Sequence, residues 1–494
     1  MADLGKTAIQ VQKAISNADN NPNWWVDAYT NKEGWYRLDQ AQRRLETLVG
    51  TLEEEPDEQP LSVVRRIYED VCHAMAEGFT KAMVKAKWTG LSSMHQTRIF
   101  PEITNNKPKP VAYFLVDALR FEMGLELAQR LPTVAEVEVG HAFGAIPTIT
   151  PIGMGALLPG ASSSFSVVEQ NGKFGVRIED TFMPDLPSRK KFTSSRIPNL
   201  VDITLNDLLS LQPSKLIKRI EGGQVIIIRS QEIDHAGETG STFQARQVMD
   251  TVIDNLARAI KKLSVAGVEY SVVTADHGHL FFAIDRDESM RTDSPGGNQI
   301  ELHRRCWIGR GGQTPTGCVR VEASSLGYES DLAFVFPTGC GVFKAGGDLA
   351  YHHGGLSLQE LVIPIISVRL KSRETSQPLV SSVQAAGIPD VVTNRIFSVT
   401  LQFGGPNLSL FPEVILVRPM LMADGRQVGA VGMAVDAELD RNTGCVKLPS
   451  DKLVTVAFLL IDETISSLRV VIQDPTTDAE LYRSPKNIPV RLGV

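Results

Sequence analysis

The hydrophobic positions of the first part of the chain, residues 1–105, recur at intervals of three and four. Segments such as AQRRLETLVGTLEE and SVVRRIYEDVCHAMAEGFTKAMVKA show this spacing, and proline is rare inside them. Such periodicity is typical of amphipathic helices. No cluster of reactive side chains accompanies it. The pattern therefore predicts a helical N-terminal region that serves docking or interaction.

From about residue 106, short and fully apolar runs alternate with amphipathic segments. VAYFLV, QVIIIRS and YSVVTA have the length of strands, and stretches such as STFQARQVMDTVIDNLARAIKKL between them have helical spacing. Apolar strands that alternate with helices are typical of a parallel sheet covered on both faces. We therefore expect an α/β domain over residues 106–375. Its glycine- and proline-rich stretch 283–348 predicts a loop-rich insertion or a lid near the site.

The helical periodicity disappears in the last part of the chain. RIFSVTLQF, EVILVRPML and LVTVAFLLID are strand-like runs separated by turn residues. Several short strands divided by turns are typical of a β-sandwich. We expect such a domain over residues 376–494, and nothing in it suggests catalysis.

Composition narrows the class of protein further. The chain has 494 residues, 50 basic and 57 acidic side chains and a net charge of −7, which argues against a uniformly basic nucleic-acid coat. The net charge does not exclude a local basic groove, because electrostatic steering of a ligand depends on where the charges lie. Three segments offer one: SRKKF (188–192), KLIKR (215–219) and ELHRRCWIGRGG (301–312). Each is equally compatible with an ordinary solvated surface.

Cysteine usage and hydropathy favour a cytoplasmic protein with no membrane span. The five cysteines are scattered and form no CxxC pair, which suits a reducing compartment. The first residues lack the apolar run of a signal peptide. The longest apolar runs, VAYFLV and VAFLLI, are far shorter than the roughly 20 residues that a membrane span requires.

Carboxylate and imidazole side chains follow three of the predicted parallel strands. Asp117 ends the first, Asp234 follows the second, and Asp276 and His277 end the third. Ligands of open parallel sheets bind beyond the carboxyl ends of the strands, so these side chains should converge on one crevice. An Asp at a strand end is often only a helix N-cap, and the convergence of several is what favours a site.

Two further segments carry candidate chemistry. Thr150 precedes a helix predicted to start at Pro151, where it is either an N-cap or a nucleophile favoured by the helix terminus and a nearby metal. His352 and His353 precede a Gly pair that lets backbone approach a bound ion closely. Adjacent histidines in a loop are also commonly solvated.

The order of these motifs resembles a known family. DALRFE, PTITPIGMGALLPG, EIDHAGE, TADHGH and HGGLSLQELVIP follow one another as in the PglZ domain, a branch of the alkaline phosphatase superfamily. The resemblance covers roughly residues 110–370. It implies an alkaline-phosphatase-like sheet core and membership in the BREX and Pgl phage-defence systems.

The resemblance also implies roles for single residues. Thr150 matches the nucleophile, and Asp117, Asp276 and His277 match the ligands that bind one metal beside it. Asp234 and His353 match ligands of the other metal. The chain has Glu238 where relatives usually have histidine. The implied cofactors are two divalent ions, zinc by family and manganese as the alternative.

Two other residues near these motifs are candidate substrate contacts. Arg120 follows Asp117 by three positions, and His279 follows His277 by two. Arg120 would grip a phosphate oxygen or else pair with a helix neighbour, and His279 would line the site without binding metal.

The function that the resemblance favours is a metal-dependent phosphodiesterase that cleaves nucleotides or nucleic acid with a Thr nucleophile. Two divalent ions can stabilise the attacking and leaving oxygens of such a displacement. The expected partners are a phosphodiester substrate and other phage-defence proteins, and the sequence does not decide whether the chain forms a homodimer. The alternatives are a non-catalytic metal-binding scaffold of the defence complex and a phosphomonoesterase or phosphomutase.

Overall fold

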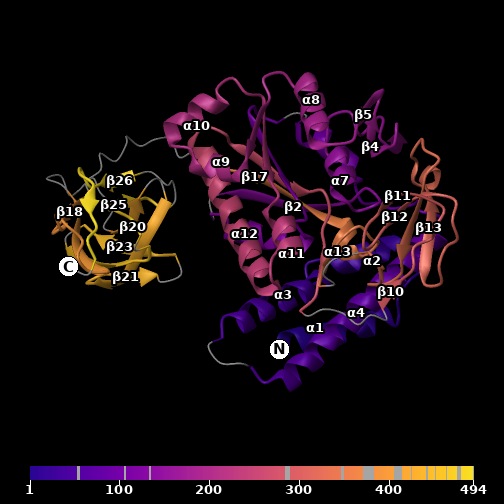
Figure 1. Cartoon of the computed structure of the whole chain (residues 1–494), viewed down its shortest axis with the longest axis horizontal. Coiled ribbons are helices and arrows are strands. Elements are labelled where there is room, and N and C mark those ends of the chain that lie inside the picture. Colours follow the sequence, from indigo (N-terminus) through magenta and orange to yellow (C-terminus); the bar gives the residue numbers. More distant parts are fainter. Residues whose placement is uncertain are drawn as a thin grey trace. The chain divides into compact units, whose positions relative to one another are not determined.

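The chain folds into two compact units, Met1–Lys371 and Ser372–Val494, which are described separately (Figure 1). The boundary expected between residues 375 and 376 lies outside the described residues. The structure, a computed structural model, describes residues 1–52, 56–104, 107–132, 135–283, 290–345, 350–370, 383–404, 414–423, 426–440, 443–450, 452–462, 464–475 and 480–492.

A six-stranded, mostly parallel sheet forms the centre of the first unit. Strands β1, β6, β7 and β8 run parallel to one another, and β17 lies antiparallel between β8 and β2. This confirms the α/β core that the alternating pattern predicts. The order across the sheet is β2 (Glu136–Phe143), β17 (Val362–Arg369), β8 (Tyr270–Ala275), β1 (Val111–Val116), β7 (Val225–Ser230) and β6 (Val201–Thr204).

The central strands are apolar because both of their faces are covered. Every residue of β1 and β7 is buried. Helix α6 (Phe121–Arg130) lies directly on β17, where a Cβ at Gly124 would come within 2.5 Å of the Pro364 side chain. Helix α12 (Thr242–Val265) runs alongside the sheet and packs against α6 (Figure 1).

The N-terminal segment is helical, as its periodicity predicts, and it packs into the same unit as the sheet. Its buried apolar side chains join one cluster with residues of the α/β region such as Phe121 and Phe143. Its main helices are α1 (Ala2–Ile15), α2 (Pro22–Thr30), α3 (Tyr36–Gly50) and α4 (Glu58–Lys85). None of the helices in the described ranges is both long and apolar enough to cross a membrane.

The stretch 283–348, expected to be loop-rich, contains a four-stranded antiparallel sheet. Its strands are only four or five residues long, so their pattern is easily lost among the glycine and proline turns. Residues 284–289 and 346–348 of this insertion lie outside the described part. The strand order is β11 (Asn298–Leu302), β12 (Trp307–Arg310), β14 (Ala333–Pro337) and β13 (Cys318–Glu322).

The second unit is rich in strands, and the strand pairs within its described ranges are antiparallel. Buried and partly exposed positions alternate along β19 (Ile396–Phe403) and β24 (Leu453–Leu460), so one face of each strand contributes to a separate apolar core. The remaining longer strands are β20 (Val414–Ala423), β21 (Arg426–Val435) and β25 (Ser467–Gln473).

A buried ionic cluster joins α3 to α6. The Arg43 guanidinium, 1% exposed, donates from Nε to Glu122 Oε1 over 3.1 Å. It also pairs with Glu126 of α6 and with Asp250 of α12. Because Glu122 is fully buried, its negative charge must find a partner inside the protein.

We expect Arg43→Ala to destabilise the first unit by about 3–5 kcal/mol, because it removes one partner of a buried ion pair. The neighbouring Arg44 provides the control, since its side chain is 59% exposed and its contact with Glu126 is 3.9 Å long. Arg44→Ala should change stability by at most about 0.5 kcal/mol. Urea unfolding of both variants measures the difference, and equal effects would contradict the role of the cluster.

Candidate metal centre

Asp117, Asp276 and His277 meet at the carboxyl edge of the central sheet. Asp117 directly follows β1, and Asp276 directly follows β8, its neighbour in the sheet, where Val116 pairs with Ala275. One ligand atom from each of the three residues lies within 4.8 Å of the others. We call this buried group the inner trio.

Backbone hydrogen bonds orient two side chains of the inner trio, Asp276 and His277, so that their remaining oxygen and nitrogen atoms are free to bind a cation. The N–H groups of Ala118 and His277 donate to Asp276 Oδ1 over 3.0 and 2.9 Å. Asp276 Oδ2 is buried and receives no hydrogen bond from the described residues. His277 Nδ1 donates to the Gly278 carbonyl over 3.0 Å, so its Nε2 carries a free lone pair. That Nε2 lies 3.4 Å from Asp276 Oδ2.

The buried surroundings of the inner trio disfavour the charged forms of its side chains. Burial, and then the nearby Asp276 carboxyl, raise the pKa of Asp117. Burial raises the pKa of Asp276 to about 6 and lowers the pKa of His277 to about 3. No Lys or Arg of the described ranges forms an ion pair with either carboxylate. A divalent cation would supply the missing positive charge to two carboxylates and a neutral imidazole.

A second group, the outer trio, consists of Asp234, Glu238 and His353. The two carboxylates lie four positions apart on α11 (Glu232–Thr239) and therefore share one face of this helix. His353 follows β16 (Tyr351–His352), and its Nε2 is 3.4 Å from Asp234 Oδ1 and 3.8 Å from Glu238 Oε1. The ligand atoms of this trio also lie within 4.8 Å of one another.

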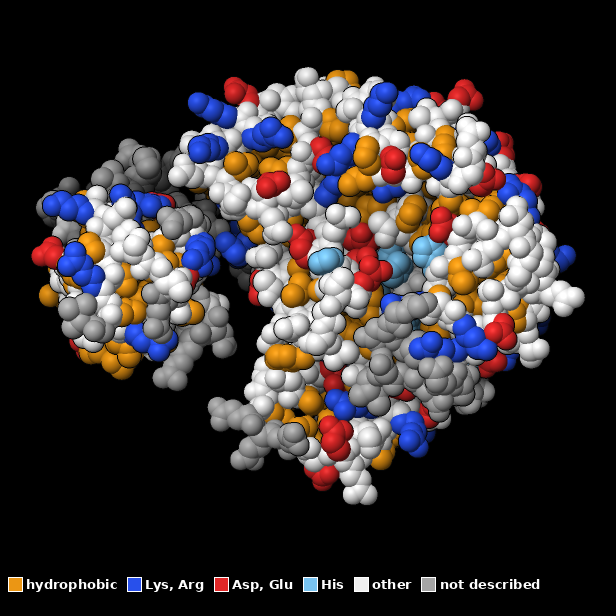
Figure 2. All heavy atoms as spheres, in the orientation of Figure 1, with side chains coloured by type: hydrophobic (Ala, Val, Ile, Leu, Met, Phe, Trp, Pro, Cys, Tyr) orange, Lys and Arg blue, Asp and Glu red, His pale blue; other side chains and the backbone are white. Residues whose placement is uncertain are grey.

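The outer trio is held by hydrogen bonds and is closer to solvent. His353 Nδ1 donates to the Thr148 carbonyl over 3.2 Å, which directs Nε2 to the carboxylates. Burial lowers the pKa of His353, but Glu238 and Asp234 raise it to about 9 overall. The Glu238 side chain is 53% exposed. Figure 2 shows acidic and histidine side chains gathered on this face of the first unit.

The two trios are adjacent. The imidazole rings of His277 and His353 stack at a centroid distance of 4.2 Å and an interplanar angle of 10°. Two protonated imidazoles would repel one another in this position, which contributes to the low pKa of His277. The arrangement therefore offers two neighbouring cation sites with oxygen and nitrogen ligands.

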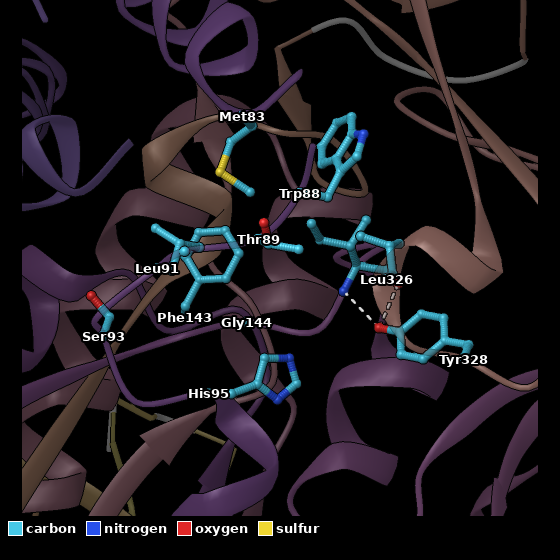
Figure 3. Close-up of a pocket in the computed structure, with 12 residues that line it drawn as sticks. Met83, Trp88, Thr89, Leu91, Ser93, His95, Phe143, Gly144, Leu326 and Tyr328 are labelled. Atoms are coloured by element: carbon cyan, nitrogen blue, oxygen red, sulfur yellow. Dashed lines mark hydrogen bonds between the residues drawn. The ribbon is translucent and has the colours of Figure 1, made fainter. Parts of the chain in front are cut away.

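Thr150 is the first residue of α7 (Thr150–Ala156) and lies beside the inner trio. Its Oγ1 is 3.4 Å from Asp117 Oδ1 and 3.3 Å from His277 Nε2. The insertion anchors the loop that precedes Thr150. The hydroxyl of Tyr328 donates to the Ile146 carbonyl over 2.9 Å and accepts from the Ile146 N–H over 3.3 Å (Figure 3). The Thr150 hydroxyl is thus fixed next to the candidate cation sites.

A hollow of about 260 Å³ opens beside the outer trio. Glu238 and His353 line it together with His303 and Arg304 of the insertion, so the third basic segment contributes to the surroundings of the site. Lys190 and Arg219, from the other two basic segments, line a separate hollow of about 350 Å³ that also contains Asp202 and Asp207.

The structure places Arg120 and His279 in the interior. Arg120 is fully buried and donates to Glu122 over 2.7 Å, which corresponds to pairing with a helix neighbour. His279 is fully buried as well, and its Nδ1 donates to the Ala118 carbonyl over 2.8 Å. Neither side chain lines the hollow beside the outer trio, so the structure does not support the substrate contacts expected of them.

Sequence reasoning missed Tyr351, which helps to position the outer trio. Its hydroxyl donates to Asp234 Oδ1 over 2.9 Å, and its ring fits closely against Gly237 of α11. The only signal in the sequence is that Tyr351 directly precedes the His pair. A tyrosine at that position is otherwise typical of any buried strand.

A comparison with known proteins shows the family to which the chain belongs. Residues 94–368, more than half of the chain, match the model of the family described as BREX system PglZ alkaline phosphatase-like domain. The chain belongs to this family. The matched range contains Thr150 and all residues of both trios.

Two curated relatives carry the family's name. The chain is 27% identical over 296 residues to the alkaline phosphatase-like protein BrxZ of Escherichia coli O9:H4 (strain HS), covering 56% of this chain and 32% of that protein. It is 26% identical over 322 residues to the alkaline phosphatase-like protein PglZ of Bacillus cereus (strain H3081.97), covering 62% of this chain and 36% of that protein. The chain thus spans about a third of the length of each relative.

Among solved structures, the chain is similar to phosphonoacetate hydrolase from Sinorhizobium meliloti 1021 in complex with phosphonoacetate. This likeness covers 55% of the chain and 92% of that protein, at 12% identity and a TM-score of 0.34.

Gly153 of α7 allows the Thr150 helix to touch the backbone of the inner trio. A Cβ at this position would lie 2.2 Å from the Asp276 carbonyl oxygen. We expect Gly153→Ala to displace α7 and to lower the free energy of unfolding by about 1–3 kcal/mol, the usual cost of overpacking. In Gly5→Ala, the matched control on α1, the new Cβ meets nothing within 4 Å, so a gain of up to about 1 kcal/mol is expected. Urea unfolding measures the free energy of unfolding of both variants. A Gly153→Ala variant more stable than the wild type would contradict the close contact.

Proposed function

We propose that this protein is a metal-dependent phosphodiesterase with Thr150 as its nucleophile. The observation that carries the proposal is the position of the Thr150 hydroxyl, 3.3 Å from His277 Nε2 and 3.4 Å from Asp117 Oδ1, beside two trios of metal-ligating type. A threonine that served only as a helix cap would not require this charged environment.

In the proposed reaction, Thr150 attacks phosphorus and Asp117 accepts its hydrogen bond. Bound divalent cations supply positive charge that favours a deprotonated threonine oxygen and stabilises charge on the phosphoryl oxygens. Asp117 Oδ1 is placed to receive the hydroxyl hydrogen bond of Thr150. Thr150 Oγ1 forms a bond to phosphorus, and the bond from phosphorus to the leaving alcohol breaks. The proton that Thr150 loses balances the one that the leaving alcohol takes up. Water then attacks the phosphorus of the threonine-linked ester, a phosphomonoester leaves, and the free hydroxyl of Thr150 is restored.

The proposed substrates are nucleotides or nucleic acid, and the proposed setting is a cytoplasmic phage-defence assembly. The family membership and the relatives named BrxZ and PglZ support the setting. His303 and Arg304 beside the outer trio support an anionic substrate, because guanidinium and imidazole donors suit phosphate oxygens. The proposed cofactors are two divalent ions, with zinc or manganese as the metal.

Metal analysis of two double variants tests the two-site arrangement. Asp276→Ala with His277→Ala should remove one metal equivalent and lower diester hydrolysis more than about 100-fold, because the cation supplies several kcal/mol of charge stabilisation. Asp234→Ala with Glu238→Ala should remove the other equivalent. Mass spectrometry of the metals and a chromogenic diester assay give both readouts. Wild-type rates in a metal-depleted double variant would rule out the proposed chemistry.

The nucleophile is tested by comparing two substitutions at Thr150. Thr150→Ala should lower kcat by orders of magnitude with a change in stability of only about 1 kcal/mol. Thr150→Ser keeps a hydroxyl and should retain substantial activity. Rapid acid quenching during turnover of a diester should trap the phosphoryl group, with its remaining ester, on residue 150 in the wild type and not in Thr150→Ala. Equal activity of the Ala and Ser variants would assign Thr150 a structural role.

A further inference from the structure

A hollow of about 210 Å³ opens between the end of α4, the loop that leads to Thr150 and the insertion (Figure 3). We call it the aromatic hollow. It shares no lining residue with the hollow beside the outer trio. Pockets for drug-sized ligands usually measure about 300–1,000 Å³, so this smaller one suits a ligand of a single ring system.

Three aromatic side chains from distant parts of the chain line the aromatic hollow. They are Trp88 after α4, Phe143 at the end of β2, and Tyr328 of the insertion. No Lys, Arg, Asp or Glu is among the described residues that line it. A phosphate or carboxylate group would lose its hydration here without gaining an opposite charge. The hollow therefore favours an uncharged, flat ring that stacks on aromatic side chains.

The backbone holds Trp88 beside this hollow in an unusual conformation. Lys87 and Trp88 follow α4 with φ values of 52° and 63°, a region that non-glycine residues rarely adopt. The Trp88 N–H donates to the Met83 carbonyl over 3.0 Å, which closes the end of the helix. Residues held in such conformations are typical of functional sites, so the position of Trp88 supports a ligand at this hollow.

His95 offers a hydrogen-bond donor to the aromatic hollow, which its side chain lines (Figure 3). Its Nδ1 accepts from the Thr97 N–H over 3.4 Å, so the proton of the neutral ring lies on Nε2. Burial lowers the pKa of His95 to about 4, and the ring is therefore neutral at pH 7. A ring nitrogen or carbonyl oxygen of a bound ligand can accept from this Nε2.

Hydrogen bonds join the aromatic hollow to the inner trio. Gln96, which follows His95, donates from Nε2 to the Asp276 carbonyl over 2.8 Å and accepts at Oε1 from the Ala145 N–H over 2.9 Å. Ala145 lies in the loop that leads to Thr150, and its two chain neighbours line the hollow. A ligand in the hollow thus contacts the loop that positions the Thr150 hydroxyl.

We propose that the aromatic hollow binds a nucleobase, a flat and uncharged ring that carries hydrogen-bond acceptors at its edge. The ring stacks on the aromatic side chains, and one edge acceptor receives the Nε2 proton of His95. The inference adds a ligand site to the proposed function and does not depend on catalysis. The base belongs either to a free nucleoside or to a nucleic-acid strand, and the test separates these two sources.

Three variants of the full chain test the proposal. His95→Phe keeps a ring of similar size and removes the donor, and Leu326→Trp fills the hollow that Leu326 lines. Ser325→Trp is the matched control, because Ser325 is exposed on the same short helix, Ala323–Leu326, and does not line the hollow. Calorimetric titrations use adenosine, guanosine, a short single-stranded oligodeoxyadenylate and 1-hexanol. Melting temperatures show whether each variant folds.

We expect the wild type to bind a nucleoside with a Kd below about 1 mM. His95→Phe should weaken this binding roughly 3- to 10-fold, the effect of one lost hydrogen bond. Leu326→Trp should weaken it at least about 10-fold, because stacking is blocked. Ser325→Trp should match the wild type. If His95→Phe does not fold, Leu326→Trp carries the test.

Two further measurements locate the ligand and its source. Adenosine should slow hydrogen exchange of residues 143–149, because the bound base contacts this loop. If the oligodeoxyadenylate competes with adenosine, the base belongs to a nucleic-acid strand, and if it does not compete, the base belongs to a free nucleoside. Either result supports the proposed site.

Unchanged nucleoside affinity in Leu326→Trp would overturn the inference, as would a wild type that binds neither nucleoside. If 1-hexanol bound more tightly than adenosine and lost its affinity in Leu326→Trp, the hollow would belong to an aliphatic ligand, which also overturns the inference. Failure of the proposed function is a separate result. In that case the metal-loaded wild type would hydrolyse no diester, while the nucleoside titrations, which require no turnover, would still report on the hollow.

Discussion

The burial of two carboxylates side by side is the constraint on which the site depends. β1 and β8 are neighbours in parallel register, so the residues that follow them, Asp117 and Asp276, meet at one edge of the sheet. Burial raises the pKa of both groups, the Asp276 carboxyl raises that of Asp117 further, and no Lys or Arg of the described residues pairs with either. Backbone donors orient Asp276, and Gly153 lets the Thr150 helix approach. A site built in this way is suited to hold a cation.

The segment after β1 serves two sides of the protein. Asp117 belongs to the inner trio, whereas Arg120 and Glu122 face the N-terminal helices. There, Glu122 accepts hydrogen bonds from both Arg120 and Arg43. The helices are therefore joined to the segment that carries the first candidate ligand. Their burial against the sheet explains why Arg120, so close to Asp117 in sequence, is not available to a substrate.

The insertion and its flanking loops complete the surroundings of the trios. Tyr328 holds the loop that leads to Thr150, and Arg304 donates to the Tyr351 carbonyl over 2.7 Å beside the outer trio. Tyr351 in turn donates to Asp234. Residues far apart in the chain thus position Thr150 and the outer trio, which explains how a short-stranded insertion contributes to the surroundings of the candidate site.

The sequence by itself determined the layout of the fold and the chemical types at the site. Apolar periodicity gave the helical start, the parallel core and the strand-rich end, because burial on one or two faces dictates the spacing of apolar residues. The order of motifs indicated Asp117, Thr150, Asp234, Glu238, Asp276, His277 and His353, which the structure brings into two trios and an adjoining hydroxyl. Tertiary structure alone decided which polar side chains face the site. Arg120 and His279, for example, point inward. The direction of a side chain depends on packing between elements distant in sequence, which local periodicity does not encode. The short strands of the insertion were likewise set by long-range pairing.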